Sequence, residues 1–200
     1  MRTENKTIEI YKFEELSEDI KEKLITEWRI NDFFSWSEEN NDSLKAFADL
    51  FDITIKDWNI GHWYINFSYD NEEIENLDFM HLRKWLINNY YDDITGKKYY
   101  STNGSYIDGN YNYKSRYSNI FITRLNCPFT GYCMDNDLIS PIFEFLDHPY
   151  DTDIKSLLDL CLQSWLESYK KDLEFWYSEE GIKEEILGND YEFTIDGKIY

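Results

Sequence analysis

Residues Ile154 to Trp176, IKSLLDLCLQSWLESYKKDLEFW, form a long segment with helical apolar spacing directly after Asp151-Thr152-Asp153. Aspartate and threonine commonly cap helix N-termini, and the apolar residues after them recur at helical spacing. The pattern predicts one long amphipathic helix over about 152–177, with an apolar face broad enough to contact several elements. That face consists of Ile154, Leu157, Leu158, Cys161, Leu162, Trp165, Leu166, Tyr169, Leu173 and Trp176.

Shorter elements are predicted on both sides of this helix. Residues that alternate between apolar and polar indicate strands, and apolar residues three or four apart that follow a capping residue indicate helices. Asp196-Gly197 is a further turn signal near the C-terminus. In chain order the predicted elements are strand 7–13, helix 18–31 capped by Ser17, helix 38–51, hairpin strands 53–58 and 62–69, helix 78–90, strand 119–125, helix 135–146 interrupted by Pro141, helix 179–187, and hairpin strands 191–195 and 198–200.

Residues 92–118 leave two interpretations open. Asp108-Gly109 is a hairpin signal between Tyr-rich flanks, which favours two short antiparallel strands. Flat, polar strands specify their register weakly, so a mobile loop is the competing interpretation.

The fold class follows from the order of these elements. Helices and hairpins are interspersed, and no linker, repeat or low-complexity segment divides the chain. We therefore predict a single α+β domain over residues 1–200, with an antiparallel sheet packed by several helices including the long C-terminal one. A chain of 200 residues is long enough to bury a sizeable core.

Charge is the unusual quantity in the composition. Forty acidic residues against twenty basic ones give a net charge of −20 and a pI near 4.4. Binding to a phosphate backbone relies on Lys and Arg, so we expect no direct binding of nucleic acid. A basic partner protein is favoured by electrostatic complementarity, although such a charge is also typical of proteins that simply stay soluble.

The cysteines and the apolar runs bear on the compartment. Cys127, Cys133 and Cys161 form an odd, sparse set, which favours a reducing environment and no disulfide framework. The N-terminal residues carry no apolar signal-peptide core, and no apolar run is long enough to span a bilayer. We therefore expect a cytoplasmic protein that does not enter a membrane.

Two acidic segments are the candidate partner-binding sites. Like charges three or four residues apart on a helix repel each other, so a chain that keeps them has a use for them or tolerates them in solvent. The first segment contains Asp70, Glu72, Glu73, Glu75 and Asp78, and the second contains Glu179, Glu180, Glu184 and Glu185.

A search for catalytic and metal-binding motifs finds none. The histidines at 62, 81 and 148 are far apart, and no glycine-rich phosphate loop or nucleophile motif is present. Asp135 and Asp137 resemble half of a calcium loop, but the glycine and distal glutamate are missing, so we predict an N-cap and a first-turn acid instead. We expect no enzyme, no metal and no cofactor.

Three separated motifs resemble a family of small acidic proteins encoded by phages and prophages. The chain opens with IYKFEELSEDIKEK over 10–23, similar to the family's Y-x-F-x-E-L-S-x-x-x-K-x-K start, and Trp28-Arg29 follows. CPFTGY at 127–132 resembles its central loop, and YEFTIDGK at 191–198 resembles its C-terminal ending. Leu24 and Ile25 stand where other members have an Ala-rich helix, which changes packing only. The resemblance implies a phage context and transfers no catalytic residue.

This context suggests an antagonist of a host defence system. CRISPR effectors hold nucleic acid in positively charged channels, which an acidic protein surface can occupy. The leading hypothesis is an anti-CRISPR or anti-restriction inhibitor that binds a basic host effector, including by mimicking nucleic acid. The main alternative is an antitoxin-like or regulatory module that neutralises a basic partner protein; an enzyme and a phage structural role are the remaining hypotheses. The oligomeric state stays open, a dimer included.

Overall fold

The computed structural model describes residues 7–31, 34–100, 106–107, 110–111, 120–124 and 127–200. The chain groups into two compact units, which are described separately below. Unit 1 contains residues 1–35 and 171–200, and unit 2 contains residues 36–170. This division says only which residues pack compactly together. It does not test the single domain expected over 1–200, which stays a prediction.

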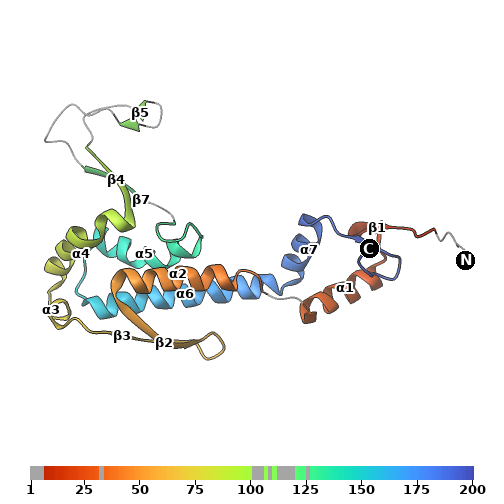
Figure 1. The fold of residues 1–200 in the computed structure, drawn as a ribbon, viewed down its shortest axis with the longest axis horizontal. Coiled ribbons are helices and arrows are strands. Elements are labelled where there is room, and N and C mark those ends of the chain that lie inside the picture. The colour runs from red at the N-terminus through yellow and green to blue at the C-terminus, as the bar shows by residue number, and fades with distance from the viewer. Residues whose placement is uncertain (1–6, 32–33, 101–105, 108–109, 112–119, 125–126) are drawn as a thin grey trace, which may run out of the picture. The chain divides into compact units, whose positions relative to one another are not determined.

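The long helix α6 (Ile154–Trp176) is the centre of unit 2, as its apolar pattern predicted. Asp153 caps it, because its Oδ1 accepts a hydrogen bond from the Ser156 backbone N–H at 2.8 Å. Trp165 is fully buried, and its Nε1 donates to the backbone oxygen of Asn40 in helix α2 (Ser37–Phe51) at 2.9 Å. Figure 1 shows α2 beside α6, in agreement with this contact.

Helix α5 (Met134–Asp147) packs in the same core and corrects one prediction. The helix runs without interruption through Pro141, although a proline in a helix interior costs about 3 kcal/mol or more. Leu138, Ile139 and Ile142 are fully buried, and burying each such side chain contributes about 1.5–3 kcal/mol. The buried face of the helix therefore outweighs the lost backbone hydrogen bond.

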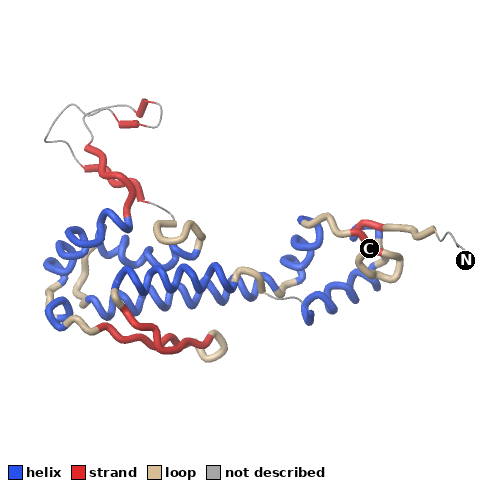
Figure 2. The backbone as a smooth tube through the Cα atoms, in the orientation of Figure 1, coloured by secondary structure: helices blue, strands red, loops and turns tan. Residues whose placement is uncertain are grey.

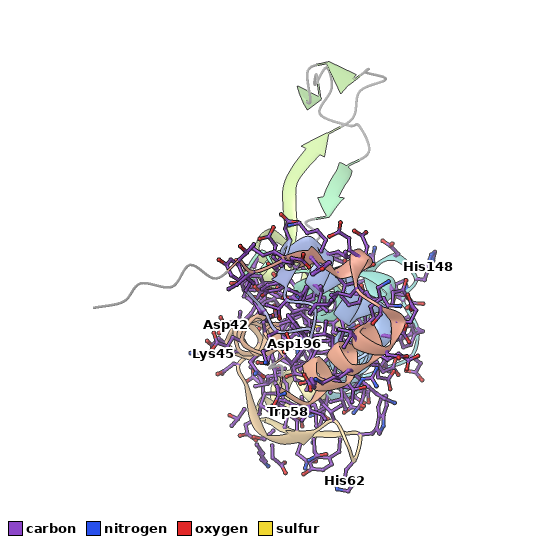
Figure 3. All side chains as sticks on the ribbon, turned by 90° about the vertical axis from the view of Figure 1, so that its right-hand side faces the viewer. Asp42, Lys45, Trp58, His62, His148 and Asp196 are labelled. Carbon is purple, nitrogen blue, oxygen red and sulfur yellow. The ribbon has the colours of Figure 1, made fainter. Side chains whose placement is uncertain are left out.

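The hairpin of strands β2 (Ile53–Asn59) and β3 (Tyr64–Tyr69) is confirmed as an antiparallel pair. Trp58 packs edge-on against Trp165 of α6, with ring centroids 5.1 Å apart. Near the turn, the ammonium of Lys170 lies 3.6 Å from the centroid of the Trp63 ring. Both contacts attach the turn end of the hairpin to α6. Figure 3 shows His62 at the tip of the hairpin.

Two helices of unit 2 connect the β2–β3 hairpin to a second antiparallel pair of strands, called the ribbon below. Helix α3 (Glu72–Glu75) is a single turn, and α4 (Phe79–Ile94) extends beyond the predicted helix 78–90. Strand β4 (Thr95–Tyr100) then pairs antiparallel with β7 (Ile120–Arg124), with Tyr99 opposite Phe121. Figure 2 shows this ribbon leaving the helices on the side opposite the β2–β3 hairpin. The strand at 95–100 was not predicted.

The Tyr-rich segment also contains a second, smaller strand pair. Strand β5 (Tyr106–Ile107) pairs antiparallel with β6 (Asn110–Tyr111), in the register that a two-residue turn between them requires. This pairing favours the hairpin interpretation over the loop. The predicted turn residues Asp108-Gly109 lie outside the described residues.

Unit 1 has a core of its own around helix α1 (Glu18–Asn31). Helix α7 (Glu179–Gly188) contributes Ile182 and Ile186, and strand β8 (Glu192–Phe193) contributes Phe193. Strand β8 pairs with β1 (Tyr11–Lys12), which is followed by a 3₁₀ turn over Phe13–Glu15. The predicted strand over 7–13 is therefore much shorter than expected. The remaining core residues are Phe13, Leu16, Leu24 and Ile25.

The start of α7 places a glycine where no side chain fits. Ser178 caps the helix by accepting a hydrogen bond from the Gly181 backbone N–H at 3.0 Å. A Cβ atom built on Gly181 would lie 2.2 Å from the backbone oxygen of Phe175. At the corner between α6 and α7, Gly181 therefore packs directly against the backbone of the last turn of α6.

Among the described residues, helices and antiparallel strand pairs coexist, so the α+β prediction and the long C-terminal helix are confirmed. The strands form separate two-stranded pairs rather than one continuous sheet. Most of the buried side chains lie on helices. The hydrophobic effect favours their burial whether or not the strands form one sheet.

A buried carboxylate organises the loop before α5. Asp135 is fully buried, and its Oδ2 accepts backbone N–H bonds from Phe129, Thr130 and Gly131 at 2.9, 2.7 and 3.1 Å. Its Oδ1 accepts the hydroxyl of Thr130 at 2.8 Å. Asp135 was predicted as the N-cap, but Cys133 holds that position and Asp135 lies in the first turn, together with Asp137. The Asp135 carboxylate therefore serves the preceding loop and not the helix end.

We expect Asp135→Ala to lower the free energy of unfolding by about 3 kcal/mol or more, because it leaves buried donors without an acceptor. Asp135→Asn keeps one acceptor oxygen and is expected to cost less. Urea unfolding followed by circular dichroism measures both. Asp159→Asn, an exposed change on α6, is the control and should cost less than about 0.5 kcal/mol. A loss for Asp135→Ala no larger than for the control would contradict the proposed role of this carboxylate.

Candidate functional site

The first predicted acidic segment lies between β3 and α4 in unit 2. Asp70 and Glu73 are exposed, and Glu75 is half-buried at the end of α3. Glu72 begins α3, and its side chain lies outside the described part of the structure. The segment therefore presents acidic side chains to solvent, on a single helical turn.

Asp78, the last member of this segment, has a structural role. Its Oδ1 accepts the backbone N–H groups of Met80 and His81, both at 3.0 Å, and its Oδ2 lies 2.6 Å from His81 Nδ1. These hydrogen bonds, first of all that from the His81 backbone, lower the pKa of the Asp78 carboxyl group. Asp78 thus caps α4 and is less available to a partner than its neighbours.

The second predicted segment is the outer face of α7 in unit 1. Glu180 and Glu184 are exposed, and Glu185 accepts a hydrogen bond from the Asn189 amide at 2.9 Å. Glu179 forms an ion pair with Lys183, one turn along the helix. This hydrogen-bonded pair lowers the pKa of the Glu179 carboxyl group, and the lysine compensates part of the acidic charge.

A groove of about 330 Å³ in unit 1 is lined by residues of α1 and α7. Glu18 and Lys21 form an ion pair at 2.8 Å within α1, on one wall of the groove. Arg29 donates from Nε to the Tyr177 backbone oxygen at 2.8 Å. Glu179 and Lys183 line the same groove. Its charges are therefore largely paired, which makes the groove a poor match for a simple anion or cation.

The two predicted segments belong to different units and are treated as separate surfaces. Unit 1 carries the stronger charge for its size: its described residues include 16 acidic and 7 basic side chains, a net charge of −9. The same residues include large exposed apolar side chains. These are Ile8, Ile10, Ile30, Phe175, Leu187, Ile195, Ile199 and Tyr200.

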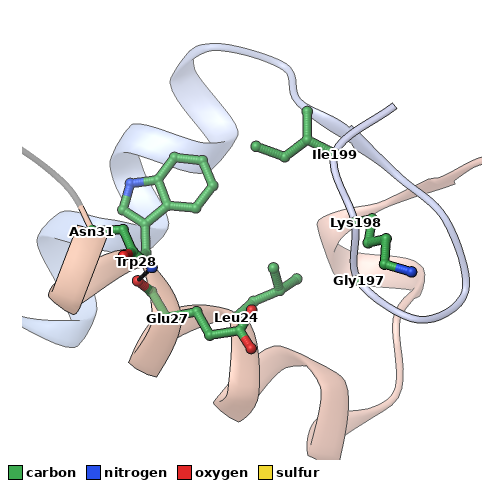
Figure 4. A pocket seen from close by; sticks show the side chains of 7 residues that line it. All are labelled: Leu24, Glu27, Trp28, Asn31, Gly197, Lys198 and Ile199. Atoms are coloured by element: carbon green, nitrogen blue, oxygen red, sulfur yellow. Dashed lines mark hydrogen bonds between the residues drawn. The ribbon is translucent and has the colours of Figure 1, made fainter.

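A pocket of about 410 Å³ in unit 1 was not predicted. Leu24, Trp28 and Ile199 are its large apolar lining residues, and Figure 4 shows the Trp28 indole and the Ile199 side chain on opposite sides of it. Glu27 and Lys198 place one charge of each sign at its edge. The pocket is thus chiefly apolar, with polar groups at the rim.

Trp28 contributes an unusual feature to this pocket. Its Nε1 is buried and has no hydrogen-bond partner among the described residues, although a buried donor ordinarily finds one. The indole packs edge-on against Tyr191, with ring centroids 5.2 Å apart. Sequence reasoning gave no signal for this site, because the chain separates Trp28 from Ile199 by most of its length.

The described residues contain no group of three or more His, Cys, Asp or Glu side chains placed to hold a metal ion. The cysteines are free thiols: Cys133 is exposed, Cys127 half-buried and Cys161 buried. None of the helices in the described ranges has the length and apolar content needed to cross a bilayer.

Comparison of the chain with known protein families, with curated proteins and with solved structures found no match in any of the three.

The turn beside the pocket depends on Gly197, which has φ of +82°. A Cβ at this position would lie 3.0 Å from Ile20 Cγ2 and 3.3 Å from Leu24 Cγ. We expect Gly197→Ala to lower the free energy of unfolding by about 1–3 kcal/mol through backbone strain, with the crowding added to it. Gly188→Ala, with no atom within 4 Å of the new Cβ, is the matched control and should be neutral or stabilising. Equal urea midpoints for the two variants would contradict this account of the turn.

The three thiols should react at different rates. Burial raises the pKa of Cys161 strongly and that of Cys127 less, and Cys133 is exposed. Because the thiolate is the reactive form, iodoacetamide near neutral pH should modify Cys133 first, Cys127 more slowly and Cys161 only after unfolding. Peptide mass mapping over time measures the order. Modification of Cys161 in the folded protein at the rate of Cys133 would contradict the buried position on α6.

Proposed function

We propose that the chain is a phage-encoded anti-defence inhibitor of the anti-CRISPR or anti-restriction type, which binds a basic host effector protein in the cytoplasm. Unit 1 is the principal binding unit. The observation that supports this choice is that one small unit carries a net charge of −9 together with eight large exposed apolar side chains. The phage context comes from the three sequence motifs described above.

The combination of charge and apolar surface distinguishes binding from plain solubility. An acidic surface that serves solubility alone keeps its large apolar side chains scattered and few. Protein interfaces combine apolar anchors with a polar rim, and complementary charge accelerates the encounter with the correct partner. We assign the anchor role to Ile199, 55% exposed beside the pocket, and to Ile195, 69% exposed and adjacent to Asp196 in the chain.

The acidic face of α7 supplies the electrostatic part of the proposed interface. Glu180 and Glu184 lie one helical turn apart and are exposed. Carboxylates spaced along a helix present a row of negative charge to a positively charged channel of the kind that holds nucleic acid in a CRISPR effector. A channel occupied in this way is closed to its nucleic acid, which accounts for inhibition without any bond-making by the chain.

The test compares three variants in which four exposed or predicted acids are neutralised. E179Q/E180Q/E184Q/E185Q changes α7, D70N/E72Q/E73Q/E75Q changes the first segment, and D42N/D49N/D151N/D159N is the control with the same change in charge. Each variant is assayed for protection of phage DNA in cells that carry CRISPR or restriction systems. Binding to the purified effector nucleases is measured at low and high salt.

We expect the α7 variant to weaken binding at least tenfold, and the control variant to weaken it less than threefold, because steering by distant charges is screened by salt. An equal loss for all three variants would show that only net charge matters. If the wild-type chain neither protects phage nor binds any effector at low salt, the proposal is wrong.

A further inference from the structure

The apolar pocket of unit 1 has a size that suits one large side chain. Its volume of about 410 Å³ lies at the lower end of the range of about 300–1,000 Å³ that is usual for ligand pockets. Leu24 and Trp28 of α1 line it together with Ile199 near the C-terminus (Figure 4). The pocket can therefore bury an apolar stem, and the polar residues at its rim select the group at the end of that stem.

The rim of the pocket presents oxygen acceptors. Glu27 is exposed, and its ion pair with Lys23 is long, at 3.7 Å. Asn31 donates its side-chain N–H to the Glu27 backbone oxygen at 2.9 Å, and this bond orients its Oδ1 as an acceptor. The basic residue in the lining, Lys198, already pairs with Asp196 Oδ2 at 2.7 Å. The rim therefore suits a hydrogen-bond donor that carries positive charge.

Trp28 adds a preference among cations. A guanidinium is planar, stacks on indole rings and presents a fork of N–H donors, whereas an ammonium is compact and strongly hydrated. Tyr191, which does not line the pocket, packs against the same indole with ring centroids 5.2 Å apart and restrains it. A guanidinium beside this ring has the acceptors of Glu27 and Asn31 within the same pocket lining. Arginine fits better than lysine on these grounds.

The charge of unit 1 opposes the other classes of side chain. Its described residues carry a net charge of −9, so an acidic group is repelled and a basic protein is attracted. An uncharged apolar side chain would fill the pocket but would desolvate the Glu27 carboxylate without supplying a donor, which is costly. A long cationic side chain satisfies both the walls and the rim.

We propose that this pocket receives an arginine side chain from a basic partner protein. The methylene stem packs against Leu24 and Ile199, and the guanidinium lies on the Trp28 indole. Glu27 and Asn31 accept its N–H groups. The inference rests on the proposed inhibitor function, because it takes the partner to be a basic protein. It adds the residue type that the partner contributes, and arginine is among the residues that most often dominate binding energy at interfaces.

Binding is measured on the full chain, without any effector, by titration with the blocked peptide acetyl-Gly-Arg-Gly-amide. The ¹H–¹⁵N signal of the Trp28 indole reports occupancy, and Trp28→Phe identifies that signal by its disappearance. We expect a saturable shift with a dissociation constant in the millimolar range, because one side chain supplies all the contacts. The matching lysine peptide should bind at least about threefold more weakly, because it lacks the planar group that stacks. The norleucine peptide, an apolar stem without charge, should give no saturable shift.

Variants at the rim separate this site from the overall charge of the unit. E27Q should weaken binding of the arginine peptide about threefold or more, because it removes the charged acceptor. K198Q should strengthen it by up to about threefold, because it removes a like charge and releases Asp196. E22Q is the matched control: it makes the same charge change on α1, but Glu22 lines the other groove, and affinity should change less than about 1.5-fold.

No saturable shift of the Trp28 signal at up to about 50 mM arginine peptide would overturn the proposal. Equal binding of the norleucine peptide would show a purely apolar site and would refute arginine as the occupant. The same loss in E27Q and E22Q would show attraction to net charge alone and would refute the assigned rim. All three outcomes leave the inhibitor proposal untouched, because the titration contains no effector. A chain that binds the arginine peptide but no effector contradicts the inhibitor proposal alone.

Discussion

The buried face of α6 is the constraint on which unit 2 depends. Trp165 alone contacts two other elements, through its hydrogen bond to the Asn40 carbonyl of α2 and its ring contact with Trp58 of β2. A buried indole fills a large volume and also needs a partner for its N–H, so Trp165 restrains α2 and the hairpin at these two contacts. The Asp135 carboxylate holds the loop that precedes α5.

Negative charge is denser in unit 1 than in unit 2. Fields from surface charges fade within about a Debye length, so a net charge of −20 does not describe what a local ligand meets. Acidic residues gather in unit 1, the outer face of α7 included.

Local patterns predicted most helices, because their caps and apolar spacing are encoded within a few residues of each other. Helices α1, α2, α6 and α7 begin and end within about two residues of the predicted limits. Contacts between distant residues could not be predicted in this way. The pocket joins Trp28 to Ile199, and the carboxylate of Asp135 bonds backward to a loop, neither of which leaves a periodic signal. To predict that α5 continues through Pro141, one would also need to know how deeply its apolar face is buried.

The glycine at the α6–α7 corner restricts how this protein can diversify. Every substitution at Gly181 would push a side-chain carbon into the Phe175 carbonyl, whereas the solvent-facing glutamates around it meet no such obstacle. Substitutions on the outward face of α7 can therefore accumulate while Gly181 is retained. The surface of this helix can change its charge and shape during evolution without loss of the fold beneath it.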